Sequence, residues 1–200
     1  MKNIAIFASG SGTNAENIIA YFSTRNTAKV ALILSNKRDS FVLERAAKHN
    51  IRSVFFERKE FYVTGKVLRY LLLYKIDFIV LAGFLWLVPD NILGQYKERI
   101  INIHPALLPD YGGKGMYGEF VHRAVIEKRE KVSGISIHYV NESYDKGSII
   151  FQSKCKIEAS DTPKTLEKKI HALEYEHYPR VIEEIVVKLP EFLIKGPEEV

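Results

Sequence analysis

The sequence predicts a three-layer α/β fold in which helices cover both faces of an open, twisted and mostly parallel sheet. First, short and almost continuously apolar segments alternate with amphipathic ones through the first half of the chain. That alternation is typical of parallel strands buried on both faces and linked by helices. Second, two successive segments in the C-terminal half have apolar residues at every second position, as in a hairpin. The expected fold is therefore Rossmann-like, with an antiparallel strand in its C-terminal half.

The elements of the first half follow one another without repeats or linkers. Residues 13–22 illustrate the helical pattern, because Ile18 and Phe22 lie on one face of the expected helix. The expected elements are a strand over 3–8, a helix over 13–22, a strand over 29–34, a helix over 41–48, a strand over 52–56, a helix over 66–74 and a strand over 78–81.

The second half is expected to hold a strand over 99–104, a helix over 117–127, strands over 133–140 and 148–157, and a helix from 163 to about 187. Asp161 or Thr162 can cap the last helix, since both side chains accept hydrogen bonds from free backbone N–H groups. Pro179 lies inside it and lacks an N–H, which predicts a kink or a break near Tyr178. The tail, 195–200, is expected to fray.

The bulk properties describe one ordinary globular domain over residues 1–200. The chain is 46% hydrophobic and 26% charged. Its longest apolar run, 78–88, is far shorter than the roughly 20 residues of a membrane span, so no membrane association is expected. The net charge of +5 comes without a dense basic run, which disfavours nucleic acid as a partner. The single cysteine, Cys155, excludes an internal disulfide and a cysteine-rich metal site.

A glycine-rich loop follows the first expected strand. Residues 9–15 read G-x-G-x-x-A into a helix, and such a loop brings backbone N–H groups and a helix N-terminus towards an anion. A dinucleotide site would place an acid at the end of the second strand. Here no acid comes before Asp39, although Lys37 and Arg38 could face the 2′-phosphate of NADP. We therefore favour a phosphate-binding loop over a turn that merely packs helix against strand. Of the possible ligands, a monophosphate is favoured over a dinucleotide.

Two polar side chains lie on one face at the end of the strand over 99–104. Strand alternation places Asn102 and His104 together, at the edge where open α/β sheets bind ligands. Asp145 lies in the connection of the expected hairpin, where a turn aspartate is the simpler interpretation. The pattern allows these three residues to meet and does not require it.

The motifs together resemble the phosphoribosylglycinamide formyltransferase family. The matching segments, in chain order over nearly the whole length, are Gly10-Ser-Gly-Thr-Asn14, Ser35-Asn-Lys37, Leu43-Glu-Arg-Ala46, Leu81-Ala-Gly-Phe84, Asn102-Ile-His-Pro-Ala-Leu-Leu-Pro109, Gly134-Ile-Ser-Ile-His138 and Asp145-Lys-Gly147. The resemblance implies formyl transfer from 10-formyltetrahydrofolate to the amine of 5′-phosphoribosylglycinamide in de novo purine biosynthesis. The implied route is direct attack through a tetrahedral intermediate, without a metal.

The resemblance also implies roles for the polar residues. Asn102 donates a hydrogen bond to the formyl oxygen, and a protonated His104 is a second donor to the developing oxyanion. Asp145 pairs with His104, favours its charged form, and positions a water that carries the proton to N10 of the folate. His138 supports this group; a core histidine is the equal alternative. The implied division is a phosphate-binding half, 1–100, and a catalytic and folate half, 101–200.

Two sets of binding residues are implied by the same resemblance. The first holds the substrate: a phosphate turn, a carboxylate for the sugar hydroxyls and a histidine for the phosphate, namely Gly12, Thr13, Asn14, Glu174 and His171. For the last two, a solvated helix face is the alternative. The second set binds the folate in an apolar slot and comprises Leu85, Trp86, Leu87, Val88, Asn102, His138 and Asn141.

Two features depart from the family pattern. Some relatives carry arginine at the position of Trp86, close to the folate. The loop 111–117 is unusually rich in glycine over Gly112–Gly115, and we expect it to form a mobile lid, with Lys114 as a contact to the phosphate or the folate tail.

The alternatives differ in what they require. A methionyl-tRNA formyltransferase needs an extra basic domain for its RNA. A formyltetrahydrofolate hydrolase would release formate with water alone, and an NADP-binding Rossmann protein would bind NADP instead of a folate. A non-catalytic nucleotide- or folate-binding protein would bind its ligand without turnover. The expected protein is cytoplasmic, acts on small molecules, and is a monomer or a homodimer.

Overall fold

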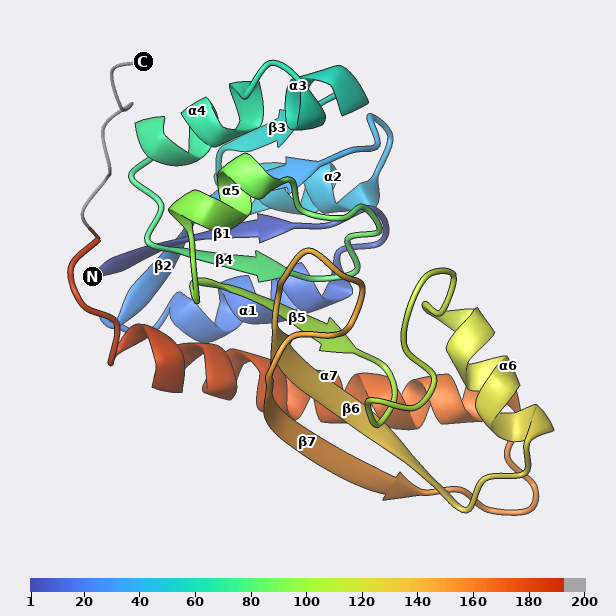
Figure 1. Cartoon of the computed structure of the whole chain (residues 1–200). Coiled ribbons are helices and arrows are strands. Elements are labelled where there is room, and N and C mark those ends of the chain that lie inside the picture. The colour runs from blue at the N-terminus through green and yellow to red at the C-terminus, as the bar shows by residue number, and fades with distance from the viewer. Residues whose placement is uncertain (193–200) are drawn as a thin grey trace.

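A seven-stranded sheet runs through the middle of the molecule (Figure 1), in the order β3-β2-β1-β4-β5-β6-β7. The computed structural model describes residues 1–192, so the expectation for the tail 195–200 lies outside the described residues. The strands are β1 (Lys2–Phe7), β2 (Ala28–Ser35), β3 (Ser53–Phe55), β4 (Phe78–Leu81), β5 (Ile100–His104), β6 (Val132–Tyr139) and β7 (Ile149–Lys156). The helices are α1 (Thr13–Phe22), α2 (Phe41–Lys48), α3 (Arg58–Tyr62), α4 (Lys66–Leu73), α5 (Asp90–Gln95), α6 (Glu119–Glu127) and α7 (Pro163–Val186).

The sheet is parallel from β3 to β5, and β6 then runs antiparallel to both of its neighbours. The predicted fold class is therefore confirmed. The register between β5 and β6 decides which polar side chains become neighbours. Asn102 lies opposite His138, and His104 lies opposite Ser136. Because side chains alternate along a strand, this register brings Asn102 and His138 to the same face of the sheet.

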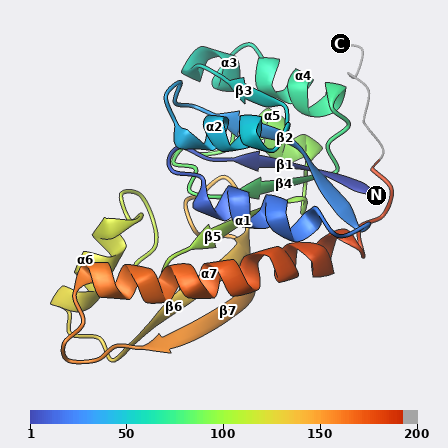
Figure 2. The ribbon, with the colours of Figure 1, turned by 180° about the vertical axis from the view of Figure 1, so that it is seen from behind.

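The helices form two outer layers. In the rear view (Figure 2), α1, α2 and α7 cover one face of the sheet, whereas α3, α4 and α5 lie beyond its upper part on the other face. Each layer has its own apolar core. One core contains Ile18, Val42, Val125 and Ile170 from α1, α2, α6 and α7. The other contains side chains of α3, α4 and α5 packed against β1, β2 and β4. This is the predicted three-layer arrangement.

Two short helices, α3 and α5, were not expected. They contain five and six residues, less than two helical turns, so they show little of the 3.6-residue periodicity that identifies a helix. A local signal does exist for α3. Glu57 and Glu60 form a reciprocal capping box, in which each side chain accepts a hydrogen bond from the backbone of the other residue.

The expected break at Pro179 is wrong, because α7 is a continuous helix of 24 residues, while the alternative of a kink stays a prediction. Proline removes the N–H that would bond to the carbonyl oxygen four residues earlier. That carbonyl belongs to Tyr175, and it accepts a hydrogen bond of 2.9 Å from the side-chain amide of Asn17 in α1. The neighbouring helix thus supplies the missing donor. At the start of α7, the cap is Thr162, whose side chain accepts from the backbone N–H of Thr165.

Candidate active site

A cavity of about 600 Å³ opens at the carboxyl ends of β1, β4 and β5. This is the edge at which open α/β sheets bind ligands. Every residue predicted for a site contributes to its lining, and they come from α1, β5, β6, α7 and four loops: Gly12, Thr13, Asn14, Leu85, Trp86, Leu87, Val88, Asn102, His104, Lys114, His138, Asn141, Asp145, His171 and Glu174. The fold therefore brings together in one place residues that are far apart in the sequence.

The glycine end of the cavity is built on the start of α1. Gly12 caps this helix with a φ of +71°, and a Cβ there would lie 2.6 Å from the Cβ of Val42. Only glycine fits both the backbone conformation and the space. The first backbone N–H groups of α1 have no partners within the helix, which makes its N-terminus suitable for an anion.

Asn14 joins this end to α7. Its amide nitrogen donates a hydrogen bond of 2.9 Å to Glu174, while its carbonyl oxygen Oδ1 is buried without a partner among the described residues. Burial raises the pKa of Glu174, although the hydrogen bond from Asn14 and the nearby His171 act to lower it. A buried acceptor and a buried carboxylate side by side can receive the hydroxyl groups of a sugar.

The dinucleotide alternative loses its main support in the structure. Lys37 and Arg38 are exposed and do not line the cavity. The guanidinium of Arg38 instead lies 4.5 Å from the centre of the Phe55 ring. Neither of the two basic side chains after β2 is therefore placed to hold the 2′-phosphate of NADP in this cavity.

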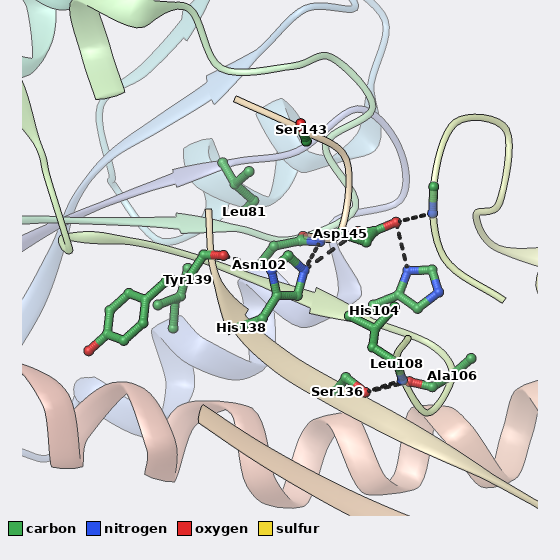
Figure 3. A network of polar contacts seen from close by, with 12 residues as sticks. Leu81, Asn102, His104, Ala106, Leu108, Ser136, His138, Tyr139, Ser143 and Asp145 are labelled. Atoms are coloured by element: carbon green, nitrogen blue, oxygen red, sulfur yellow. Dashed lines mark hydrogen bonds and ion pairs between the residues drawn. The ribbon is translucent and has the colours of Figure 1, made fainter. Parts of the chain in front are cut away.

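Asn102 and His138 form the first pair of the polar end (Figure 3). The Asn102 amide nitrogen lies 3.2 Å from Nε2 of His138, and Nδ1 of His138 lies 2.8 Å from the carbonyl oxygen of Tyr139. A carbonyl only accepts, so Nδ1 carries a proton, and Nε2 faces the amide nitrogen of Asn102. The second N–H of the Asn102 amide is then left for a ligand.

Asp145 lies between two histidines (Figure 3). Its Oδ2 is 3.5 Å from Nδ1 of His104, and its Oδ1 is 3.5 Å from Nε2 of His138. The backbone N–H of Gly113 also donates to Oδ2 at 2.9 Å. On the other side of the His104 ring, Nε2 lies 2.8 Å from the Tyr111 carbonyl and therefore carries a proton.

The pKa values of this group move in the same direction for different reasons. Burial alone would raise the pKa of Asp145, but its contacts with His138, His104 and Gly113 outweigh burial and lower it. Burial lowers the pKa of His104; Asp145 and the Tyr111 carbonyl act to raise it and are outweighed. Asp145 therefore acts against the effect of burial on the pKa of His104 but does not overcome it.

The position of Asp145 depends on tight backbone packing in the β6–β7 connection. Asp145 has a φ of +54°, which an aspartate tolerates better than most residues. Two residues on, a Cβ at Gly147 would lie 1.7 Å from the Tyr139 carbonyl oxygen. Gly112 is also tightly placed, since a Cβ there would lie 2.6 Å from Leu108 and 3.3 Å from Cβ of Asp145. Glycine at these positions lets the two loops meet.

The apolar wall of the cavity is formed by residues 84–88. Its backbone is held from both sides, since Ser9 accepts from the N–H of Leu85 and the Tyr144 hydroxyl lies 3.5 Å from the Leu85 carbonyl. The Trp86 ring belongs to an aromatic cluster, 6.0 Å from Tyr62 and 6.1 Å from Phe61, with Arg58 5.5 Å from its centre. Trp86 thus packs against this aromatic cluster.

The loop 111–118 closes the cavity from the α6 side. Tyr111, Gly113, Gly115 and Gly118 all have positive φ, and backbone groups of the loop contact both His104 and Asp145. Lys114 is exposed on the loop and lines the cavity. That the loop moves, and that Lys114 binds a ligand, stay predictions.

Two contributors were missed from the sequence. The Tyr111 carbonyl caps His104 through its backbone, which no side-chain pattern can reveal. His122 lines the cavity from α6, and it did leave a signal: it is a polar residue on the apolar helix face that also carries Val121 and Val125.

Within residues 1–192, no three His, Cys, Asp or Glu side chains are grouped closely enough to hold a metal ion. None of the helices described is both long enough and apolar enough to cross a membrane.

Comparisons with known proteins identify the family of this chain. A family model described as formyl transferase matches residues 2–182. The phosphoribosylglycinamide formyltransferase of Bacillus subtilis is 38% identical over 191 residues, which cover 93% of this chain and 95% of that protein. The chloroplastic enzyme of the same name from Arabidopsis thaliana is 38% identical over 90% of this chain, which spans 64% of that protein. The crystal structure of phosphoribosylglycinamide formyltransferase from Bacillus halodurans superposes with a TM-score of 0.84 at 39% identity, over 94% of this chain and 96% of that one. This chain therefore belongs to the formyl transferase family, and the three relatives just described are named phosphoribosylglycinamide formyltransferases.

Proposed function

We propose that the chain transfers the formyl group of 10-formyltetrahydrofolate to the amine of 5′-phosphoribosylglycinamide, a step of de novo purine biosynthesis. The observation that carries the proposal is the position of Asn102, His104 and Asp145 on one wall of a cavity whose other end is the start of α1 beside Glu174. The first group suits acyl transfer, and the second suits a phosphorylated sugar. The names of the matching relatives support the same reaction.

The cavity has the properties that both substrates need. The wall over residues 84–88 is apolar and presents backbone groups, which suits a flat heterocycle such as the pterin of a folate. The opposite end contains the unpartnered Oδ1 of Asn14, which a sugar hydroxyl can satisfy. We assign the folate to the residues on the first wall together with Asn102, His138 and Asn141. We assign the phosphorylated amine to Gly12, Thr13, Asn14, His171 and Glu174.

Asn102 and His104 stabilise charge on the formyl oxygen as the substrate amine attacks the formyl carbon. The free N–H of the Asn102 amide donates to that oxygen. The Nε2–H of His104, which now donates to Tyr111, becomes a second donor once the Tyr111 carbonyl moves away. A donor of this kind is worth about 2.7–4 kcal/mol in the transition state.

Asp145 handles the proton. The new bond joins the formyl carbon to the amine, the bond to N10 of the folate breaks, and one proton passes from the amine to N10. Asp145 is ionised at neutral pH because its contacts lower its pKa, so it can accept a hydrogen bond from a water that relays this proton.

The whole chain, 1–200, is assigned as one formyltransferase domain, with residues 1–100 supplying the phosphate site and 101–200 the catalytic and folate residues. We further propose a cytoplasmic protein that is a monomer or a homodimer. Size-exclusion chromatography with light scattering separates these two states.

The test mixes purified protein with 10-formyltetrahydrofolate and phosphoribosylglycinamide and follows release of tetrahydrofolate by absorbance. We expect release that requires the amine. Release in water alone, at the same rate with and without the amine, would instead identify a formyltetrahydrofolate hydrolase. No release in either mixture would contradict the proposal and lead to a test of NADP(H) binding.

A further inference from the structure

His122 is a buried histidine of the cavity that the proposed reaction does not use. It lies on α6 between Val121 and Val125, is 2% exposed, and contributes to the cavity lining. The helix α6 lies against α7 (Figure 2). A side chain in this position is fixed in place by the apolar residues on either side of it.

The imidazole of His122 has no hydrogen-bond partner among the described residues. Its Nδ1 is buried and unpaired, and no hydrogen bond from the described part of the chain reaches its other ring nitrogen. Burial lowers the pKa of His122, which favours the neutral ring, with one N–H donor and one acceptor. A buried polar group that stays unpaired is costly, and in native proteins such groups have a partner or a function. Residues 1–192 supply none, and Nε2, unlike Nδ1, is not fully enclosed, so a molecule in the cavity can reach Nε2 and serve as its partner.

The charged neighbours of His122 indicate which substrate that is. Glu167 and His171 of α7 act on it electrostatically, as do His104 of β5 and Glu119 of its own helix. His122 is therefore within electrostatic range of both His104 and α7, the helix that also carries Glu174. The folate wall over 84–88 comes from a different loop, which follows β4.

We propose that His122 determines specificity for the phosphorylated amine, by a hydrogen bond from its imidazole to the part of that substrate between the reacting amine and the sugar. This inference rests on the proposed function. It assigns to α6 a direct contact with the amine substrate.

The test measures binding of phosphoribosylglycinamide by calorimetry, without folate, to His122→Phe, His122→Gln and a control, Arg123→Gln. Arg123 is the next residue on α6, is exposed and pairs with Glu119. We expect His122→Phe to weaken binding about three- to tenfold, the worth of one neutral hydrogen bond. His122→Gln, whose amide reaches the position of Nε2, should recover part of the loss, and the control should bind like the unchanged protein.

Two further readouts separate this contact from a structural role. Loss of an unpaired buried nitrogen should leave the melting temperature of unliganded His122→Phe equal or higher. In steady-state kinetics, the KM for the amine should rise without a matching rise in the KM for the folate. Should His122→Phe fail to fold, His122→Asn replaces it, because its shorter amide cannot reach the Nε2 position.

Equal affinity for the amine in His122→Phe and the unchanged protein would overturn the inference, as would a parallel rise in both KM values. If the unchanged protein neither binds phosphoribosylglycinamide nor transfers a formyl group to it, the proposed function fails as well. Normal transfer by the unchanged protein together with an unaffected variant would overturn only the role of His122.

Discussion

The two ends of the cavity are built in different ways. The glycine end depends on one short stretch of backbone, where Gly12 turns the chain into α1 and the helix start offers its N–H groups. The polar end depends on side chains brought together by β-sheet register, with Asn102 opposite His138 and Asp145 arriving from the β6–β7 connection. The first end should therefore fail when backbone sterics change, and the second when a charge or a donor is removed.

The largest expected effect is at the polar end, in Asp145→Asn. The amide can still accept from the Gly113 N–H, so the loop should stay in place, but it has no charge with which to handle a proton. We expect kcat to fall by about 10²–10⁴-fold, the usual contribution of general acid–base catalysis. Steady-state kinetics test this against Lys146→Gln, a change at the neighbouring position. A loss no larger than in that control would contradict the role of Asp145.

At the glycine end, Gly12→Ala should act on stability and substrate binding together. The left-handed backbone alone costs about 1–2 kcal/mol for a residue with a Cβ, and contact with Val42 adds to this. Urea denaturation should show the loss, and affinity for the phosphorylated amine should fall. Gly10→Ala is the matched control, because a Cβ there meets nothing within 4 Å. Adding Val42→Ala should recover only a small part of the loss, because it removes the contact with Cγ2 but leaves Cβ and Cα of residue 42 within 2.8 Å; full recovery would show that the backbone conformation is not the cause.

Glu174→Gln should separate binding from stability. Burial raises the pKa of Glu174, so its folded-state value exceeds the unfolded one, and its stabilising contribution is lost as pH rises through the raised value. At pH 7 the variant should be more stable, a gain that shrinks as pH falls below the raised pKa and is gone below about pH 4.3. Binding of the phosphorylated amine should weaken, because a charged acceptor is replaced. The exposed Glu176→Gln is the control, and an unchanged affinity would contradict the assignment to the substrate.

The smallest effect concerns pH. Burial lowers the pKa values of His104 and His122, so the unfolded chain binds more protons than the folded one. Stability should be full above about pH 6.5 and fall as pH drops towards the lowered values, by at most about 1.4 kcal/mol per pH unit for each histidine. Asp145, with its lowered pKa, adds a loss of the same sign at more acidic pH. Urea denaturation at a series of pH values should show that the free energy of unfolding depends less steeply on pH in His122→Phe than in the unchanged protein. An equal dependence would show that His122 does not contribute to it.

Local patterns were enough for most of the fold. The bounds of α1 and α2 agree with the expected helices at both ends, because helical periodicity and the glycine and serine that precede them lie within a few residues. The positions of the strands along the first half of the chain were predicted from continuous apolar runs, which only a sheet covered on both faces can bury. The site residues were found through the resemblance of short motifs, which are also local in the chain.

The tertiary structure decided what depends on distant partners. Pro179 does not break α7, because Asn17 from another helix satisfies the Tyr175 carbonyl. Asp145 is more than a turn residue, because the β5–β6 register and a second loop place it beside His104. The unpaired ring of His122 becomes visible only once its neighbours in the described part of the chain have positions. Residue type and periodicity report whether a side chain is buried, whereas hydrogen-bond partners and burial-shifted pKa values depend on which remote segment packs against it.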